Sequence, residues 1–459
     1  MSKKLLSFLG GGYYEKCTYK STDLPKKVKR EYSTYFIQEA LTEIFCKNWV
    51  KEDEVIIFLT HRAKEENYLE NKKKKVPRTN DKFEHRKGLK NDLESHNYGF
   101  TLKDIYIEDG NSMKEIWDNF EIIINEINDG DEIIFDITHA FRYIPILALV
   151  VLNYAKSLKN IKINGIYYGN YEYKNEAYNN PEFSNDEKPI MNLVQLDEIL
   201  EWSQAVDSFV KYGNSDHIKN FAKEVLRRNK NIDYYKKEEK VIKDLVNSLN
   251  DFTNTVQTCR GRTVEQSDST NSITKAYEKL VENLDLFMQS EKNSMKPLRH
   301  IIGKIEDSLG IFKKIENREE IINTGLGIVH WSLNNNLIQQ AYTALLETIV
   351  SYMCILEGEN YNNRESREEV KKYYNNIYYD NRFLKSYEIQ GDIKNEIARI
   401  SYKLSCIRND VNHYGYCMKS YEENKPSKSY NDLKNIIKQN YKEFENCVVR
   451  EEKKQLVLC

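Results

Sequence analysis

The sequence predicts an open α/β sheet of mainly parallel strands over the first two hundred residues, followed by an all-α remainder. Short apolar runs alternate with helical patterns up to about residue 170, an order that is typical of βαβ units. The run V-I-I-F-L at 55–59 holds no polar residue, as expected of a strand that is buried on both faces. From about Asp197 onward, helical patterns rich in Lys, Glu, Leu and Ile continue to the end.

The elements of the first part follow one another in a regular order. The expected strands are the apolar runs at 4–9, 55–59, 104–107, 132–137 and 163–169. The expected helices lie at 32–49, 113–127 and 142–158, where apolar residues recur at helical spacing. The segment between Asn67 and His96 is poor in apolar residues and contains K-K-K-K. We expect it to be a solvated, mobile insertion, whose lysines could also contact phosphate.

Length and charge bound the organisation of the chain. At 459 residues the chain exceeds what one hydrophobic core usually covers. We expect an α/β domain at 1–200, a helical connector at 201–330 and an all-α domain at 331–459. The formal net charge of -2 excludes a global basic field, so any nucleic-acid site must be a local patch.

Cysteine usage and hydropathy predict a cytoplasmic protein. The eight cysteines are scattered, with no C-x-x-C motif and no zinc-type spacing to histidines, which is typical of reduced thiols. The longest apolar run, Ile144 to Leu152, is shorter than the roughly 20 residues that cross a bilayer. We therefore expect no membrane contact, no metal and no cofactor.

Glycine-rich and polar segments follow three of the predicted strands. Gly10-Gly11-Gly12-Tyr13 follows the first strand, Thr60-His61-Arg62 the second, and D-I-T-H-A-F-R at 136–142 the fourth. Ligands of open α/β sheets bind outside the carboxyl ends of the strands, so these segments are expected to meet at one edge. The candidate ligand-binding residues are Gly10, Gly11, Gly12, Tyr13, Thr60, Asp136, Thr138, His139, Phe141 and Arg142.

These residue types indicate a nucleotide or an oligonucleotide as the ligand. A glycine turn lets backbone N–H groups approach a phosphate, and a helix N-terminus adds partial positive charge. Thr138 is expected to cap the helix that follows, Arg142 offers a fork for phosphate oxygens, and Tyr13 and Phe141 could stack on bases. The glycines do not form G-x-G-x-x-G, and no acidic residue ends the second strand, which argues against a dinucleotide cofactor.

A second candidate site lies at the end of a predicted amphipathic helix. Its apolar stripe consists of Ile393, Ile397, Ile400, Leu404, Ile407 and Val411. The polar block Arg408-Asn409-Asp410-Val411-Asn412-His413 closes this helix. His413 could take a proton from a ribose 2′-hydroxyl or give one to the leaving oxygen, and Arg408 could hold the phosphate. The pair therefore suits metal-independent cleavage of RNA.

The spacing of this pair bears on oligomeric state. Five residues on an ideal helix correspond to a rotation of about 140°, so one copy does not converge on a single point. Two copies that face each other across a dimer axis could do so. The alternative interpretation is a surface arginine and histidine that simply cap a helix end.

The two groups of motifs, taken together, resemble a known combination of domains. L-L-S-F-L-G-G-G-Y, D-I-T-H-A-F-R before an apolar helix, and G-I-Y-Y-G make the first 210 residues similar to CARF domains. These are Rossmann-like sensors of cyclic oligoadenylates in type III CRISPR systems. The R-N-x-x-x-H block, together with Q-Q-A-Y-T-A-L-L-E-T-I-V at 339–350, resembles HEPN ribonuclease domains. The chain has Ala140 where CARF domains often have glycine.

The resemblance implies a CRISPR-associated endoribonuclease of antiviral defence that works as a homodimer or a higher homo-oligomer. A cyclic oligoadenylate, with cyclic tetra-adenylate as the expected ring, would act as allosteric activator, and single-stranded RNA would be the substrate. Arg408 and His413 would be catalytic, and Asn409 and Asp410 would support them.

Two alternative functions stay open. One is a transcription regulator that reads DNA through K-E-V-L-R-R-N-K at 223–230. The other is a ring nuclease that degrades its activator with Thr60 and His139, beside an inert helical half.

Overall fold

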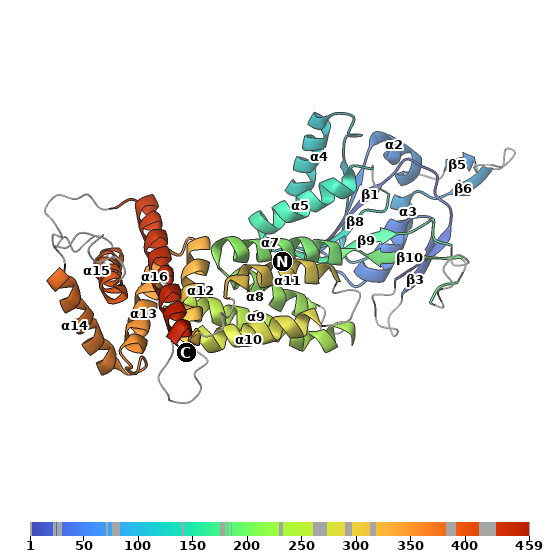
Figure 1. The fold of residues 1–459 in the computed structure, drawn as a ribbon. Coiled ribbons are helices and arrows are strands. Elements are labelled where there is room, and N and C mark those ends of the chain that lie inside the picture. Colours follow the sequence, from blue (N-terminus) through green and yellow to red (C-terminus); the bar gives the residue numbers. More distant parts are fainter. Residues whose placement is uncertain are drawn as a thin grey trace. The chain divides into compact units, whose positions relative to one another are not determined.

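The computed structural model consists of two compact units, Met1–Glu198 and Ile199–Cys459 (Figure 1). The residues that it describes are 2–21, 24, 30–69, 72–75, 83–139, 142–174, 180, 182–184, 186–228, 233–259, 273–289, 296–312, 318–381, 392–412 and 428–458.

Unit one contains an eight-stranded sheet in the order β3-β2-β10-β9-β8-β1-β4-β7. The strands are β1 Lys3–Leu9, β2 Cys17–Ser21, β3 Glu31–Thr34, β4 Glu54–Leu59, β7 Thr101–Tyr106, β8 Glu132–Asp136, β9 Lys162–Gly169 and β10 Glu187–Asn192. β1 pairs in parallel with β4 and β8, and β7 and β9 extend this parallel core on its two sides. The predicted parallel α/β sheet is confirmed, and chain order reverses between β1 and β8.

Helices cover both faces of the sheet, because the central strands are apolar on both sides. In β1, Leu5 and Leu9 join the core cluster that includes residues of α1 (Ile37–Leu41), η1 (Thr42–Cys46) and α3 (Leu89–Ser95). Leu6 and Phe8 of the same strand point into the opposite cluster, beneath α4 (Met113–Asn125) and α5 (Ile144–Lys159). This alternation follows from the two-residue period of a strand and explains why polar groups concentrate at the strand ends.

The predicted helix at 32–49 is wrong in its first part. Glu31–Thr34 forms β3, which pairs antiparallel with β2, and the helical turns begin only at Ile37. The strands β2, β3 and β10 were not predicted. A pairing partner from elsewhere in the chain overrides the local helical pattern here, because strand preference depends on context.

The lysine-rich insertion is also more ordered than its composition predicts. After α2 (His61–Ala63), its described residues form the π-helical turn η2 (Lys64–Tyr68), an antiparallel hairpin and α3. The hairpin consists of β5 (Lys72–Lys75) and β6 (Phe83–Arg86). Leu89 and Leu93 of α3 are buried in the core of unit one. The prediction of a loop is therefore wrong for these residues, and Leu89 and Leu93 are not solvated.

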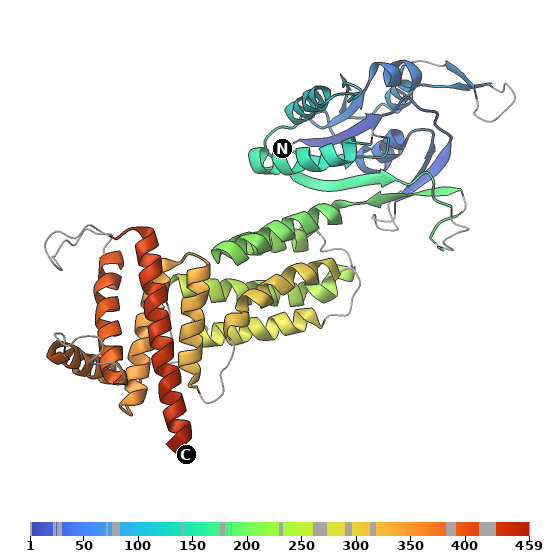
Figure 2. The same ribbon diagram turned by 45° about the horizontal axis from the view of Figure 1, so that its top comes forward.

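Unit two is all-α in its described residues, as predicted. Its helices, of which the first starts in unit one, are α7 Val194–Tyr212, α8 Asp216–Arg228, α9 Asp233–Gln257, α10 Ile273–Met288, α11 Lys296–Leu309, α12 Glu320–Asn334, α13 Ile338–Leu356, α14 Arg364–Asn381, α15 Ile393–Asn412 and α16 Tyr430–Leu458, with the 3-10 turn η4 Gly310–Phe312 after α11. Helices α12, α13, α15 and α16 run side by side (Figure 2).

Two hydrophobic cores meet at α12. Ile328 and Trp331 pack into the core formed with α7 to α11, whereas Val329 and Leu333 pack into the core formed with α13 to α16. A helix that is apolar on opposite faces has to be buried between two layers. The predicted division of the helical part at residue 330 stays a prediction. Within the part of the chain that is described, no helix is long and apolar enough to span a membrane.

Candidate functional site

Asp136 ends β8 and is fully buried at the point where strand order reverses. Its carboxylate accepts hydrogen bonds from the Ser7 hydroxyl at 2.5 Å, the Thr138 N–H at 3.0 Å and the Thr138 hydroxyl at 2.6 Å. Burial raises the pKa of Asp136, while the bonds from Ser7 and Thr138 oppose that rise. Asp136 therefore joins β1 to the segment after β8 from inside the sheet.

Thr138 does not cap the following helix, so this part of the prediction is wrong. Helix α5 begins after Tyr143, which makes no side-chain cap. The Thr138 hydroxyl is engaged elsewhere: it donates to Asp136 and accepts from the Gly169 N–H at 2.8 Å. Thr138 thus links the ends of β8 and β9 and shapes the segment that carries His139.

His139 stands beside the glycine loop, which consists of Gly10, Gly11 and Gly12. Its ring lies edge-on to Tyr14, with ring centroids 4.4 Å apart. Burial lowers the pKa of His139 to about 4, so the imidazole is neutral at neutral pH. Its Nε2 atom is buried and has no hydrogen-bond partner among the residues that are described. A buried nitrogen without a partner is unusual in a folded protein, which marks His139 as a candidate residue of the site.

The glycine loop approaches the His139 segment closely. Gly10 N–H donates to the Tyr14 hydroxyl at 2.9 Å. A Cβ atom on Gly10 would lie 3.2 Å from that hydroxyl and 3.4 Å from the His139 carbonyl oxygen. A Cβ atom on Gly11 would lie 3.0 Å from Cγ of Arg62. The structure therefore brings together the loops after β1, β4 and β8, as the prediction of a common edge required.

Asn67 and Arg86 hold the glycine loop through hydrogen bonds, and neither residue was predicted from the sequence. Asn67 donates through Nδ2 to the carbonyl oxygens of Gly10 at 2.7 Å and Gly12 at 2.8 Å. The Arg86 guanidinium donates to Asn67 Oδ1 and to the Tyr14 carbonyl oxygen, both at 2.7 Å. Both residues lie in the insertion that was expected to be solvated. Within K-F-E-H-R-K, no local signal marks Arg86 as buried.

The remaining candidates of this edge differ in their roles. Thr60 is buried and caps α2, because its hydroxyl accepts the Ala63 N–H at 3.4 Å. Tyr13 lies over Arg86, 5.6 Å from the guanidinium carbon to the ring centroid. Arg142 is exposed, and Phe141 lies outside the described residues.

The amphipathic stripe of α15 is confirmed. Ile393, Ile397, Ile400 and Leu404 are buried in the core of α12 to α16, and Ile407 packs against it. The end of α15 lies next to the start of α13, where Gln339 Nε2 donates to Asn412 Oδ1 at 3.1 Å. The stripe thereby fixes which face of the polar block points outward.

The polar block at the end of α15 is only partly described. Arg408 is half-buried, and its Nε atom is buried without a hydrogen-bond partner among the described residues. Asn409 and Asp410 are exposed. His413 lies outside the described residues, so its approach to Arg408 stays a prediction.

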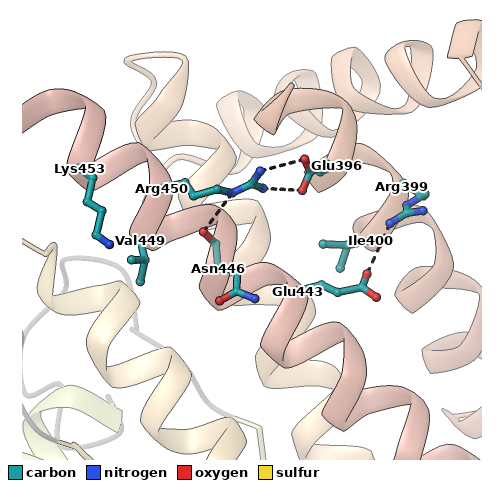
Figure 3. A pocket seen from close by; sticks show the side chains of 8 residues that line it. All are labelled: Glu396, Arg399, Ile400, Glu443, Asn446, Val449, Arg450 and Lys453. Carbon is teal, nitrogen blue, oxygen red and sulfur yellow. Dashed lines mark hydrogen bonds and ion pairs between the residues drawn. The ribbon is translucent and has the colours of Figure 1, made fainter. Parts of the chain in front are cut away.

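A groove of about 410 Å³ lies between α15 and α16 (Figure 3). Its lining residues are Glu396, Arg399, Ile400, Glu443, Asn446, Val449, Arg450 and Lys453. Arg450 binds both carboxylate oxygens of Glu396, and Arg399 lies 3.6 Å from a Glu443 oxygen. The arginines of the groove are thus offset by carboxylates, and none of the predicted catalytic residues lines it. Among the described residues, no group of three or more histidines, cysteines or carboxylates could hold a metal.

Comparison with known proteins assigns the two parts of the chain to domain types. Residues 4–181 match the family model of the CARF domain of the CRISPR system endoribonuclease Csx1. Residues 198–317 match the model of the second domain of CRISPR-associated protein MJ1674. The CRISPR-associated protein MJ1674 of Methanocaldococcus jannaschii is 27% identical over 338 residues. That match covers 72% of this chain but only 45% of the relative.

The α/β sheet with its glycine loop and His139 segment is therefore a CARF domain of the Csx1 type. In this chain the domain precedes a segment that is similar to the second domain of the CRISPR-associated protein MJ1674. Neither family match reaches the end of α15, where the predicted catalytic residues lie.

Proposed function

We propose that this protein is an endoribonuclease that a cyclic oligoadenylate activates and that cuts single-stranded RNA without a metal ion. The observation that carries the proposal is the meeting of the glycine loop and His139 at the switch point of a Csx1-type CARF domain. Switch points are where open α/β sheets bind ligands. Backbone N–H groups of glycine turns suit phosphates, and a ring of adenylates presents several of them.

The chemistry of cleavage is assigned to the end of α15. Arg408, with its buried Nε lacking a partner in the described part of the chain, would bind the scissile phosphate and offset the charge that develops on it. His413 would move the proton of the 2′-hydroxyl or of the leaving oxygen, and Asn409 and Asp410 would support them. Two protomers would supply the complete site.

The test is a cleavage assay with a fluorescent single-stranded RNA, run in EDTA with no ring or with rings of three, four or six adenylates. We expect cleavage that needs one of the rings, with four adenylates as the first candidate, and that survives EDTA. Arg408→Ala and His413→Ala should each lower the rate by at least about a hundredfold, because general acid–base groups and charge stabilisers contribute on that scale. Undiminished cleavage by both variants would remove the assigned site.

The same protein samples distinguish the proposed RNA cleavage from two alternative activities. A transcription regulator would shift duplex DNA in a gel and leave RNA intact. A ring nuclease would cleave the cyclic oligoadenylate without cutting the RNA substrate, and His139→Ala would slow that cleavage. Cleavage of RNA that rises with the ring contradicts both alternatives as complete descriptions.

A further inference from the structure

The insertion between β4 and α3 is fastened to the glycine loop by a chain of buried polar groups. Arg86, at the end of β6, is 4% exposed, and Asn67, at the end of η2, is 1% exposed. The Arg86 guanidinium lies between 5.3 and 5.8 Å from the ring centroids of Tyr13, Tyr14, Tyr35 and Phe36. A charge buried to this degree is tolerated where hydrogen bonds and aromatic faces compensate it. Arg86 meets both conditions.

The effect of Asn67 on the loop follows from peptide geometry. Asn67 binds the carbonyl oxygens of Gly10 and Gly12, which belong to two different peptide groups. In a trans peptide the N–H points opposite to the C=O of the same plane. The N–H groups of Gly11 and Tyr13 are therefore turned away from the buried amide of Asn67.

N–H groups that point away from the protein interior are suited to bind an anion. N–H groups of one loop that face outward together form a concave site for phosphate oxygens. Among the described residues, a Cβ atom on Gly12 would meet nothing within 4 Å, so they leave the approach to the loop open there. Arg86 orients the amide, because Asn67 Oδ1 accepts from Arg86 and Nδ2 is thereby directed at the loop.

We propose that Asn67, held by Arg86, is a positioning residue that presets the peptide groups of Gly11 and Tyr13 for the phosphates of the bound ring. The identity of that ligand rests on the function proposed above. The insertion thereby acts on ligand binding through the glycine loop, without a direct contact to the ligand by Asn67 or Arg86.

The decisive variant is Asn67→Asp. It keeps the size of the side chain and its bond to Arg86, which holds the carboxylate ionised. It replaces the two N–H donors by an oxygen that faces two carbonyl oxygens. We expect binding of cyclic tetra-adenylate to weaken about tenfold or more, since two buried acceptors lose their donor. The ring concentration for half-maximal RNA cleavage should rise by the same factor, and the rate at saturation should stay unchanged.

A matched control is available at the opposite, amino edge of the same sheet. Lys4 is 2% exposed and lies 3.1 Å from Asp131 and 3.2 Å from Glu54. Lys4→Met removes a comparable buried polar contact and should lower the melting temperature without changing the affinity for the ring. Affinities are measured by calorimetry well below the melting temperature of each variant.

The outcomes are separable. Wild-type protein that binds none of the three rings overturns the proposed function and this inference with it. If wild-type protein binds a ring and Asn67→Asp binds it equally well, the inference alone is overturned. An equal loss of affinity in Lys4→Met would overturn it too.

If Asn67→Asp does not fold, Arg86→Lys replaces it, because an ammonium cannot make both guanidinium bonds in the same geometry. Arg86→Lys should weaken ring binding several-fold, and unchanged affinity would again overturn the inference.

Discussion

The candidate ligand site depends on a few residues whose ordinary properties are altered by burial. His139 is the clearest case, because burial lowers its pKa from 6.5 to about 4. Between those two pH values the unfolded chain binds a proton that the folded chain does not. The free energy of unfolding is therefore fully retained above pH 6.5 and falls as the pH drops toward 4, by up to about 1.4 kcal/mol per pH unit.

His139→Gln tests this pH dependence. The raised pKa of Asp136 acts in the opposite direction, so the informative quantity is the difference between wild type and variant. Urea unfolding from pH 7 to pH 4.5 should show a larger loss of stability in the wild type than in His139→Gln. Parallel curves for the two proteins would mean that the imidazole is not held neutral by the fold.

The glycines after β1 make separate predictions. In the described part of the chain, a Cβ atom on Gly12 meets nothing within 4 Å, and one on Gly11 meets Arg62 at 3.0 Å. Gly12→Ala should therefore keep the melting temperature of the wild type but weaken ring binding, since the new methyl group occupies the approach to the loop. Gly11→Ala, the matched comparison, should also displace Arg62. Unchanged affinity in Gly12→Ala would place the ligand elsewhere.

Among the helices and strands, the sequence predicted those whose apolar residues follow a local strand or helix pattern. Most strands of the parallel core were predicted because they are short apolar runs, although β7 is half polar, and the stripe of α15 was predicted because its period is helical. The strands β2, β3 and β10 are partly polar, and each is fixed by pairing with another segment: β3 with β2, and β10 with β9 and with the distant β2. Local composition carries no signal for such pairing.

The same reason explains which site residues could be predicted. Gly10 to Gly12 and His139 follow apolar strands, so the general rule for α/β sheets located them. Asn67 and Arg86 sit in a lysine-rich segment, where a buried arginine differs from a solvated one only by its partners. Thr138 was assigned a cap because its residue type favours one, but Asp136 and Gly169 engage its hydroxyl instead.

The apolar stripe of α15 packs into the core of the helical unit and thereby fixes the position of the helix that carries the polar block. Leu404 is fully buried, so Leu404→Ala should reduce the free energy of unfolding of the helical unit by about 2–5 kcal/mol. Lys403 is exposed on the same helix, and Lys403→Ala serves as the control with little expected change. Thermal melts followed by circular dichroism measure both. Equal melting temperatures would mean that α15 is not packed as described.

Across the whole molecule, the proposed ligand site lies in unit one, whereas Arg408 and His413 belong to the sequence of the helical unit two. Rotation along the helix separates these two residues by about 140° if it continues ideally, so a second protomer is expected to complete the site. Sedimentation should give twice the mass of one chain, and specific RNA cleavage should fall on dilution below the dissociation constant. A monomer that stays fully active would contradict the composite site.

One variant, His413→Ala, tests ring binding and RNA cleavage together. We predict that it binds cyclic tetra-adenylate with the affinity of the wild type, because the proposed ring site lies in the sheet of the other unit. Saturated with the ring, it should cut RNA at least about a hundredfold more slowly. Cleavage at the wild-type rate by this ring-bound variant would contradict the account.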